Sequence, residues 1–225
     1  MIANAIYFKA FWQDQFRKEH TQAEPFTLLS GEEVECQMMH HGWSFNYWQD
    51  DDLEAIRLPY VAPNINSDIG MYIVLSKRRQ QFASSFLQRM TFSKWEAVVN
   101  NVDHQRLYGE IALPRFNAEY ERDVADDLKA LGMECAFNSQ CADFSQMSKS
   151  AAQIWLSNVL HKAFIKVDEE GTEAGAATVV MHVGGVGGPR IPVFHMVVDH
   201  PFIYVIKDNN TGAILFMGVT TDPRQ

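Results

Sequence analysis

Few residues in this chain have the type and spacing that chemistry at a metal or a nucleophile requires. The three cysteines, Cys36, Cys135 and Cys141, form no CxxC pair, and no Cys/His cluster has zinc spacing. His40 and His41 are adjacent, and adjacent strand residues point to opposite faces, so they are poorly placed to share one ion. We therefore expect no metal and no cofactor. The odd number of cysteines excludes a fully paired disulfide framework and favours buried thiols.

The unusual chemistry lies in one segment, residues 168–192, with the sequence DEEGTEAGAATVVMHVGGVGGPRIP. Between Glu173 and Arg190 this segment has no carboxylate, lysine or arginine, and five glycines fall within it. A flexible linker should be polar throughout, and the run Ala176–Met181 is not. A structureless loop of this length inside a compact domain is uncommon and is usually functional. The composition therefore indicates a functional loop.

The same loop has the pattern of a strand. With a side-chain period of two, one face of residues 172–180 carries Thr172, Ala174, Ala176, Thr178 and Val180. That face has no charge and little bulk, so it could enter a sheet without burying an unpaired charge. On such an insertion Thr172 would be the first side chain to enter the interior, with Glu173 facing outward. A segment that suits both an exposed loop and a strand is what a conformational switch needs.

The elements that must position this loop are mostly strands. Strands are expected over residues 2–11, 69–75, 106–116, 151–167, 193–206 and 213–219, with several short ones within 26–60. Helices are expected within residues 80–99 and over the stretch that Asp123 can cap and Gly132 ends. No repeat or low-complexity linker divides the chain. The pattern indicates an α+β fold in which residues 1–225 form a single domain.

The composition of the chain restricts the classes of partner that it could bind. The net charge is −9 at pH 7 and the basic residues are scattered, so nucleic acids and acidic membranes are poor partners. No apolar run is long enough to span a bilayer. Residues 1–10 lack the basic start and long apolar centre of a signal peptide, whereas the sequon Asn209-Asn210-Thr211 suits a secreted protein. We expect an extracellular location, with the cytoplasm as the alternative.

Several stretches resemble the serpin family, in the family's order. The stretch that resembles the hinge of inhibitory serpins is Glu169, Glu170, Gly171, Thr172, Glu173, Ala174, Gly175, Ala176, Ala177 and Thr178. Further matching stretches are residues 4–12 (NAIYFKAFW), 58–60 (LPY), 113–116 (LPRF), 131–145, 161–164 (HKAF), 199–202 (DHPF) and 215–218 (LFMG). The resemblance implies a monomer with mixed multi-stranded sheets, a few helices and an exposed reactive-centre loop at about residues 169–192. It also implies a partial domain, since a serpin has a further N-terminal portion of comparable size.

By this resemblance the protein is a serine protease inhibitor and not an enzyme. A protease attacks the loop, forms an acyl-enzyme and is trapped when the cut loop inserts into the main sheet. The family's spacing of sixteen residues after Glu169 places the reactive bond at Gly185–Val186. Val186 suits an elastase-like protease, whereas the alternative bond Arg190–Ile191 suits a trypsin-like one. The remaining alternative is a non-inhibitory serpin with a chaperone, carrier or storage role.

Asn4 and His161 have a role that only the resemblance implies. In serpins the histidine that matches His161 hydrogen-bonds the asparagine that matches Asn4 and helps to control the opening of the main sheet. From the residues alone, a single histidine on an apolar strand is usually a satisfied core residue. With the resemblance, we expect His161 and Asn4 to pair across the sheet.

Overall fold

The structure is a computed structural model that describes residues 1–62, 64, 67–79, 86–147, 154–172 and 191–224. The chain divides into two compact units: Met1–Phe8 with Ala118–Ile165, and Lys9–Asn117 with Lys166–Gln225. Within the described residues, no helix is both long and apolar enough to cross a membrane. In the same part of the chain, no three His, Cys, Asp or Glu side chains are grouped to hold a metal ion.

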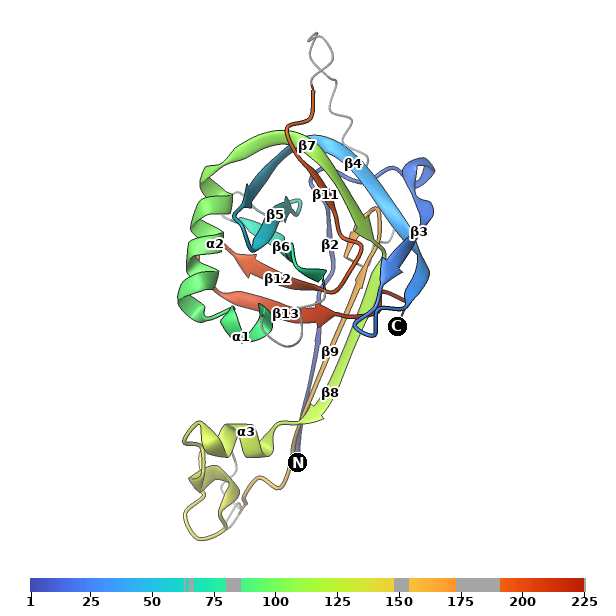
Figure 1. Cartoon of the computed structure of the whole chain (residues 1–225). Coiled ribbons are helices and arrows are strands. Elements are labelled where there is room, and N and C mark those ends of the chain that lie inside the picture. Colours follow the sequence, from blue (N-terminus) through green and yellow to red (C-terminus); the bar gives the residue numbers. More distant parts are fainter. Residues whose placement is uncertain (63, 65–66, 80–85, 148–153, 173–190, 225) are drawn as a thin grey trace. The chain divides into compact units, whose positions relative to one another are not determined.

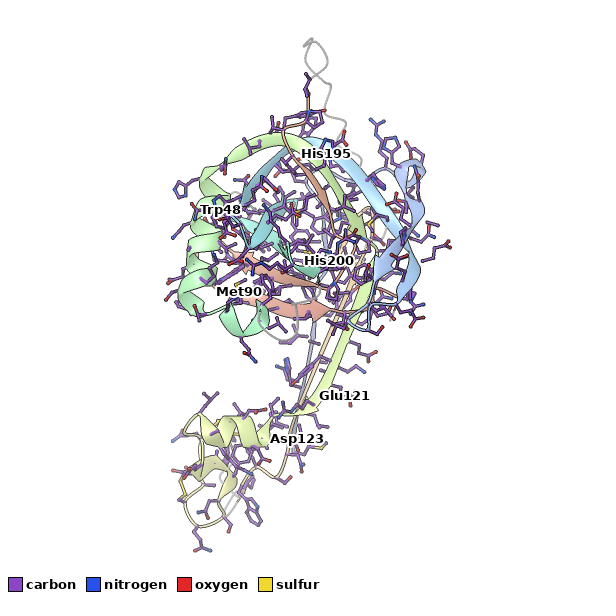
Figure 2. All side chains as sticks on the ribbon, viewed as in Figure 1. Trp48, Met90, Glu121, Asp123, His195 and His200 are labelled. Atoms are coloured by element: carbon purple, nitrogen blue, oxygen red, sulfur yellow. A yellow bond between two sulfur atoms is a disulfide. The ribbon has the colours of Figure 1, made fainter. Side chains whose placement is uncertain are left out.

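The first unit is built on strand β9 (Val159–Val167), which pairs in parallel with β1 (Ile2–Tyr7) and also pairs with β8 (Phe116–Asp123). Its helices are α3 (Ala125–Ala130) and the short η4 (Cys135–Phe137). One carboxylate oxygen of Asp123 accepts hydrogen bonds from the backbone N–H of Ala125 at 3.0 Å and of Val159 at 3.1 Å. The N-cap position is held by Val124, which makes no side-chain cap, so the expected cap at Asp123 lies one residue too early. The Asp123 carboxylate still bonds the first helical N–H and fixes the start of β9 (Figure 2). At the other end Gly132 has φ +98°, which confirms it as the residue that ends the helix.

The second unit holds the remaining elements. They are β2 (Ala10–Phe11), η1 (Lys18–His20), β3 (Gln22–Thr27), β4 (Glu33–Gln49), β5 (Leu53–Pro59), β6 (Ile69–Ser76), α1 (Leu87–Arg89), α2 (Phe92–His104), β7 (Arg106–Pro114), β10 (Gly171–Thr172), β11 (His195–Val197), β12 (Phe202–Asp208) and β13 (Ile214–Thr220). Its main feature is a sheet with the strand order β11-β7-β4-β5-β6-β12-β13, in which β3 also pairs with β4 (Figure 1). The α+β fold class is therefore confirmed.

Strand β4 is longer than the sequence predicts, because it spans 17 residues instead of breaking into short strands. Three partners share its length: β3 pairs with residues 33–38, β7 with residues 38–46 and β5 with residues 46–49. Each partner ladder holds part of the strand extended, and no local sequence pattern reports such a change of partner.

The core of this sheet lies under α2, beside β5, β6 and β12 (Figure 1). Trp95, Val98, Val99 and Val102 of α2 are buried, and their spacing places them on one helix face. Trp95 meets Tyr72 of β6 edge-on with ring centroids 5.5 Å apart. The continuous apolar run expected to be a strand buried on both faces is β6, in which seven of the eight residues are buried.

Two predicted strands are shorter than expected. The strand predicted over residues 193–206 is interrupted between β11 and β12, where Pro201 has no backbone N–H to donate and the ring of buried His200 lies 2.7 Å from the carbonyl oxygen of Ser76. The strand predicted over residues 151–167 begins only at Val159. The expectation of buried thiols is correct for Cys36 and wrong for Cys135 and Cys141, which form a disulfide. The sequence did not predict this disulfide, because an odd number of cysteines does not show which two of them meet in space.

Candidate functional site

Residues 12–21, which we call the anchor segment, hold the start of the loop. Within the segment Trp12 is buried, and its indole ring stacks on Tyr60 with centroids 4.5 Å apart and planes 12° from parallel. The indole N–H donates to the carbonyl oxygen of Asp168 at 2.9 Å. The backbone N–H of the same tryptophan donates to the carbonyl oxygen of Glu170, also at 2.9 Å. One buried residue, through its side chain and its backbone, therefore fixes both the position and the direction of the chain that enters the loop.

Glu169, between these two residues, is a buried carboxylate with a full set of partners. Its side chain is only 2% exposed. The Arg115 guanidinium donates from Nε to both carboxylate oxygens at 2.9 and 3.0 Å and from Nη2 to Oε1 at 2.5 Å. The Thr21 hydroxyl donates to Oε1, and the backbone N–H of Phe16 donates to the carbonyl oxygen of Glu169 at 3.0 Å. This pattern is a paired buried charge, which resists displacement because moving it would leave the carboxylate without partners.

The surroundings of Glu169 keep it ionised. Burial by itself would raise its pKa, but the hydrogen bonds from Arg115 and Thr21 outweigh burial and hold the pKa below the ordinary value of 4.5. Next to it, the Glu170 carboxylate receives an ion pair from Lys18 at 2.5 Å, on a more exposed part of the anchor segment. The base of the loop is therefore held by charge pairs as well as by backbone hydrogen bonds.

Gly171 passes so close to β2 that no side chain fits there. A Cβ atom at this position would lie 2.2 Å from the carbonyl oxygen of Ala10 and 2.7 Å from the Cα atom of Phe11. Its φ of +151° is also one that residues with a side chain rarely adopt. The backbone conformation and the close approach to β2 both explain why the first residue of β10 is a glycine.

Thr172 is already inside a sheet, which corrects the expectation that its side chain enters only on insertion. The residue pairs with Ala10 of β2 and with Val167 of β9, and it is 0% exposed. Its hydroxyl oxygen lies 2.6 Å from the hydroxyl oxygen of Tyr60, whose pKa is raised by burial. Two neighbouring strands and one hydrogen bond hold this threonine in place, and a period-two pattern cannot reveal where an insertion starts.

The rest of the predicted loop lies largely outside the described residues. This applies to the hinge positions Glu173–Thr178, to the proposed reactive bond Gly185–Val186 and to Arg190 of the alternative bond. Ile191 is described and is 85% exposed. The reactive bond therefore stays a prediction from sequence.

The far end of the loop is fixed by Phe194. Its ring is buried and stacks on Tyr47 with centroids 3.8 Å apart and planes 3° from parallel. The ring lies over Gly109, where an added Cβ atom would come within 2.3 Å of it. Directly after Phe194 the chain enters β11, where His195 contacts Glu110 of β7 at 3.1 Å (Figure 2). The segment before Gly171 and the segment after Val193 are therefore both docked in the second unit.

In the first unit the structure places Asn4 directly opposite His161. The two residues are partners in the parallel pairing of β1 with β9, as the expected pair requires. Among the described residues no hydrogen bond joins their side chains, and the ring of His161 lies 6.1 Å from that of Tyr120. Their role in the control of sheet opening stays a prediction.

One Asp–His pair invites comparison with hydrolases. His200 Nδ1 lies 2.8 Å from a carboxylate oxygen of Asp199, and Nε2 lies 2.7 Å from the carbonyl oxygen of Ser76 (Figure 2). In a hydrolase the second nitrogen faces a nucleophile, whereas here it faces a backbone acceptor. The pair therefore ties β12 to the end of β6 and is not arranged for acid–base catalysis.

Sequence reasoning missed three residues that position the loop. Arg115 and Thr21 lie far from Glu169 in the chain, at separations of 54 and 148 residues. Phe194 carries no motif of its own. A usable signal was Gly109 within an alternating strand, because glycine in a strand marks a close approach by another group.

Comparisons with known proteins agree with this architecture. The family model described as "Serpin (serine protease inhibitor)" matches residues 1–223. The chain is 32% identical over 224 residues to Serpin-Z4 of Hordeum vulgare, covering 99% of this chain and 55% of that protein. It is 33% identical over 228 residues to the human leukocyte elastase inhibitor, covering 99% of this chain and 58% of that protein.

A solved structure shows the same relationship. The native stressed conformation of AtSerpin1 from Arabidopsis matches with a TM-score of 0.75 and 27% identity, over 98% of this chain and 56% of that one. The chain thus spans about half the length of the relatives it matches. With the family model matching almost every residue, this chain belongs to the serpin family.

Proposed function

We propose that the protein inhibits serine proteases as a suicide substrate. The observation that carries the proposal is that the uncharged face of the loop continues from a residue that already lies in a sheet. Thr172 is buried between β2 and the end of β9. In strand register the next side chains on its face are those of Ala174, Ala176 and Thr178, all small and uncharged. The loop can therefore lengthen β10 without burying a charge.

The proposed reaction uses the protease's own chemistry. The protease serine Oγ attacks the carbonyl carbon of Gly185, an ester forms, and the amine of Val186 leaves with the proton that the protease supplies. Hydrolysis of the ester by water would release an intact protease and a cut loop. Inhibition requires the cut loop to lengthen β10 before this hydrolysis, so that the bound protease is displaced and its active site distorted.

Two features of the structure favour insertion over simple loop mobility. The Glu169–Arg115 pair holds the start of the loop, so the cut segment can pivot only from Gly171 onward. In the first unit β1 pairs with β9 through six residue pairs, from Ile2 with Val159 to Tyr7 with Phe164. A strand inserted between β1 and β9 would replace one ladder of hydrogen bonds by two, which is a net gain of backbone bonds.

The partner and the location belong to the same proposal. We infer an elastase-like target if cleavage falls at Gly185–Val186, and a trypsin-like target if it falls at Arg190–Ile191. We also infer a monomer in an extracellular setting, which the Cys135–Cys141 disulfide supports because disulfides persist in oxidising compartments.

Incubation of the full-length protein with a neutrophil-type elastase and with trypsin tests the proposal. We expect a complex that survives SDS and boiling, with a mass equal to the inhibitor plus the protease minus the released C-terminal peptide. Mass spectrometry of that peptide identifies the reactive bond. Cleavage of the loop by every protease without a stable complex would contradict the proposal and would favour a non-inhibitory role.

A further inference from the structure

His41 is the most unusual titratable residue near the anchor segment. Its ring lies 5.5 Å from that of Phe16, 5.6 Å from that of Phe45 and 6.5 Å from that of Trp43. Within the described residues, its Nε2 is shielded from solvent and has no hydrogen-bond partner. Its neighbours in the β4–β7–β11 row, Ile111 and Met196, are buried and apolar. Protonation at Nε2 would create a charged N–H group with no acceptor.

The charged groups that face His41 come from the anchor segment. Burial is the main influence and lowers the pKa of His41 below its ordinary value of 6.5. Asp14 opposes this shift, whereas Arg17 and His20 add to it. The neutral imidazole is therefore the form that fits the closed packing.

The neighbouring histidines lie on the opposite face of the sheet and have the opposite charge relationship. His40 contacts Glu24 at 2.7 Å, and His195 contacts Glu110 at 3.1 Å. Both of these histidines face a carboxylate, whereas within the described residues the Nε2 of His41 has no acceptor.

Solvent can reach the region around His41. A cavity of about 440 Å³ is lined by His20, His40, His41, Ile111, His195 and Met196, among others.

His41 is mechanically connected to the start of the loop through Phe16. The Phe16 ring packs on the His41 ring, and the Phe16 backbone N–H donates to the carbonyl oxygen of Glu169. Trp12 and Lys18 of the same segment hold Asp168 and Glu170. Any movement of the anchor segment away from His41 therefore strains the contacts that this segment makes with residues 168–170.

We propose that His41 is an acid-sensitive latch: its protonation lifts the anchor segment from β4 and removes the contacts of that segment with residues 168–170. The closed state binds fewer protons than an opened state in which His41 is exposed. The closed state is therefore fully stable above about pH 6.5 and loses stability as pH falls below that value, by at most about tenfold in the opening equilibrium per pH unit for one proton. Glu169 stays ionised through this window because its pKa lies below 4.5. The latch goes beyond protease inhibition, since it holds whether or not the loop traps a protease.

Hydrogen–deuterium exchange on the full-length protein tests the latch. Deuterium uptake is measured between pH 7.5 and 5.5 in peptides covering residues 12–21 and 166–172. The uptake is corrected for the intrinsic pH dependence of exchange and compared with the uptake in peptides of β5, β6 and β12. For the wild type we expect the opening equilibrium to rise below pH 6.5 with a slope approaching tenfold per pH unit. His41→Gln should abolish the rise, whereas the matched control His40→Gln on the opposite face should retain it.

Two results would overturn the latch: a wild type without the rise, or a His41→Gln variant that keeps it. If His41→Gln does not fold, His41→Phe fills the same aromatic site without a titratable group, and it should also remove the rise. As an independent measurement, the His41 ring can be titrated by NMR in the wild-type protein. A midpoint at or above 6.5 would exclude the latch, and a midpoint well below 6.5 would support it.

Discussion

The pair of Arg115 and Glu169 should respond asymmetrically to the loss of either partner. The Glu169 side chain is 2% exposed, whereas that of Arg115 is 43% exposed. Arg115→Leu leaves a buried carboxylate that keeps the hydrogen bond from Thr21 and one from a backbone N–H but loses its counter-charge. Glu169→Gln leaves a guanidinium that water can still reach. We therefore expect Arg115→Leu to be the more damaging change.

The magnitude follows from how each variant can relieve its unpaired charge. Removing one partner of a buried ion pair costs about 3–5 kcal/mol. The stranded carboxyl group can instead take up a proton, which from an ordinary pKa of 4.5 costs about 3.4 kcal/mol at pH 7 and about 0.7 kcal/mol at pH 5. Arg115→Leu should therefore lose about 3 kcal/mol at pH 7 and much less at pH 5. Glu169→Gln should lose about 1–2 kcal/mol at both pH values, since the hydrogen bonds from the Arg115 guanidinium lose the negative charge of their acceptor.

The pH dependence of the wild type has the opposite sign. Because the folded state lowers the pKa of Glu169, the stability that this group contributes is present above about pH 4.5 and is lost as pH falls through the folded pKa. In Arg115→Leu the pKa of Glu169 should rise, so lowering the pH from 7 to 5 should stabilise this variant relative to the wild type.

Urea unfolding of the full-length proteins at pH 7 and pH 5 measures these differences. The exposed pair of Arg122 and Asp127, with side chains 57% and 50% exposed, supplies the control: Arg122→Leu should cost less than about 0.5 kcal/mol. Equal losses for Arg115→Leu and Glu169→Gln, or a loss in Arg115→Leu that does not shrink at pH 5, would refute the reasoning.

Three further changes test the hinge and the sheet. Gly171→Ala places a Cβ atom 2.2 Å from the carbonyl oxygen of Ala10, so we expect the free energy of unfolding to fall by about 2–4 kcal/mol. Thermal or urea unfolding measures this loss, and an unchanged stability would show that β2 shifts at little cost. Ala176→Arg puts a charge on the inward face of the predicted strand, so we expect this variant to be cleaved as a substrate without forming the covalent complex in a gel assay. The control Ala177→Arg, on the other face, should still trap the protease, and equal trapping by both variants would contradict insertion. If His161 controls the opening of the sheet, as the serpin resemblance implies, His161→Ala should speed polymer formation on mild warming, and an unchanged rate would return His161 to an ordinary structural role.

The period-two pattern and the composition predict a loop with a strand-forming face, and beyond Thr172 that prediction falls outside the described residues. They also located β6 by its apolar run, and α3 by Asp123 near its start and Gly132 at its end. These features succeed because local sequence decides them: side-chain period, capping and backbone freedom act within a few residues. The serpin resemblance added the family and the order of the strands.

The tertiary structure alone decided what holds the loop. Glu169 meets Arg115 across 54 residues and Thr21 across 148, and Thr172 meets Tyr60 across 112. Such contacts depend on which strands pair and in which register, and a shift of one residue would turn each of these side chains to the opposite face. The sequence therefore predicts that the segment after Gly171 can join a sheet. Only the packing of the anchor segment against β4 and β10 determined that Thr172 has joined it already, because that burial is set by neighbours distant in the chain.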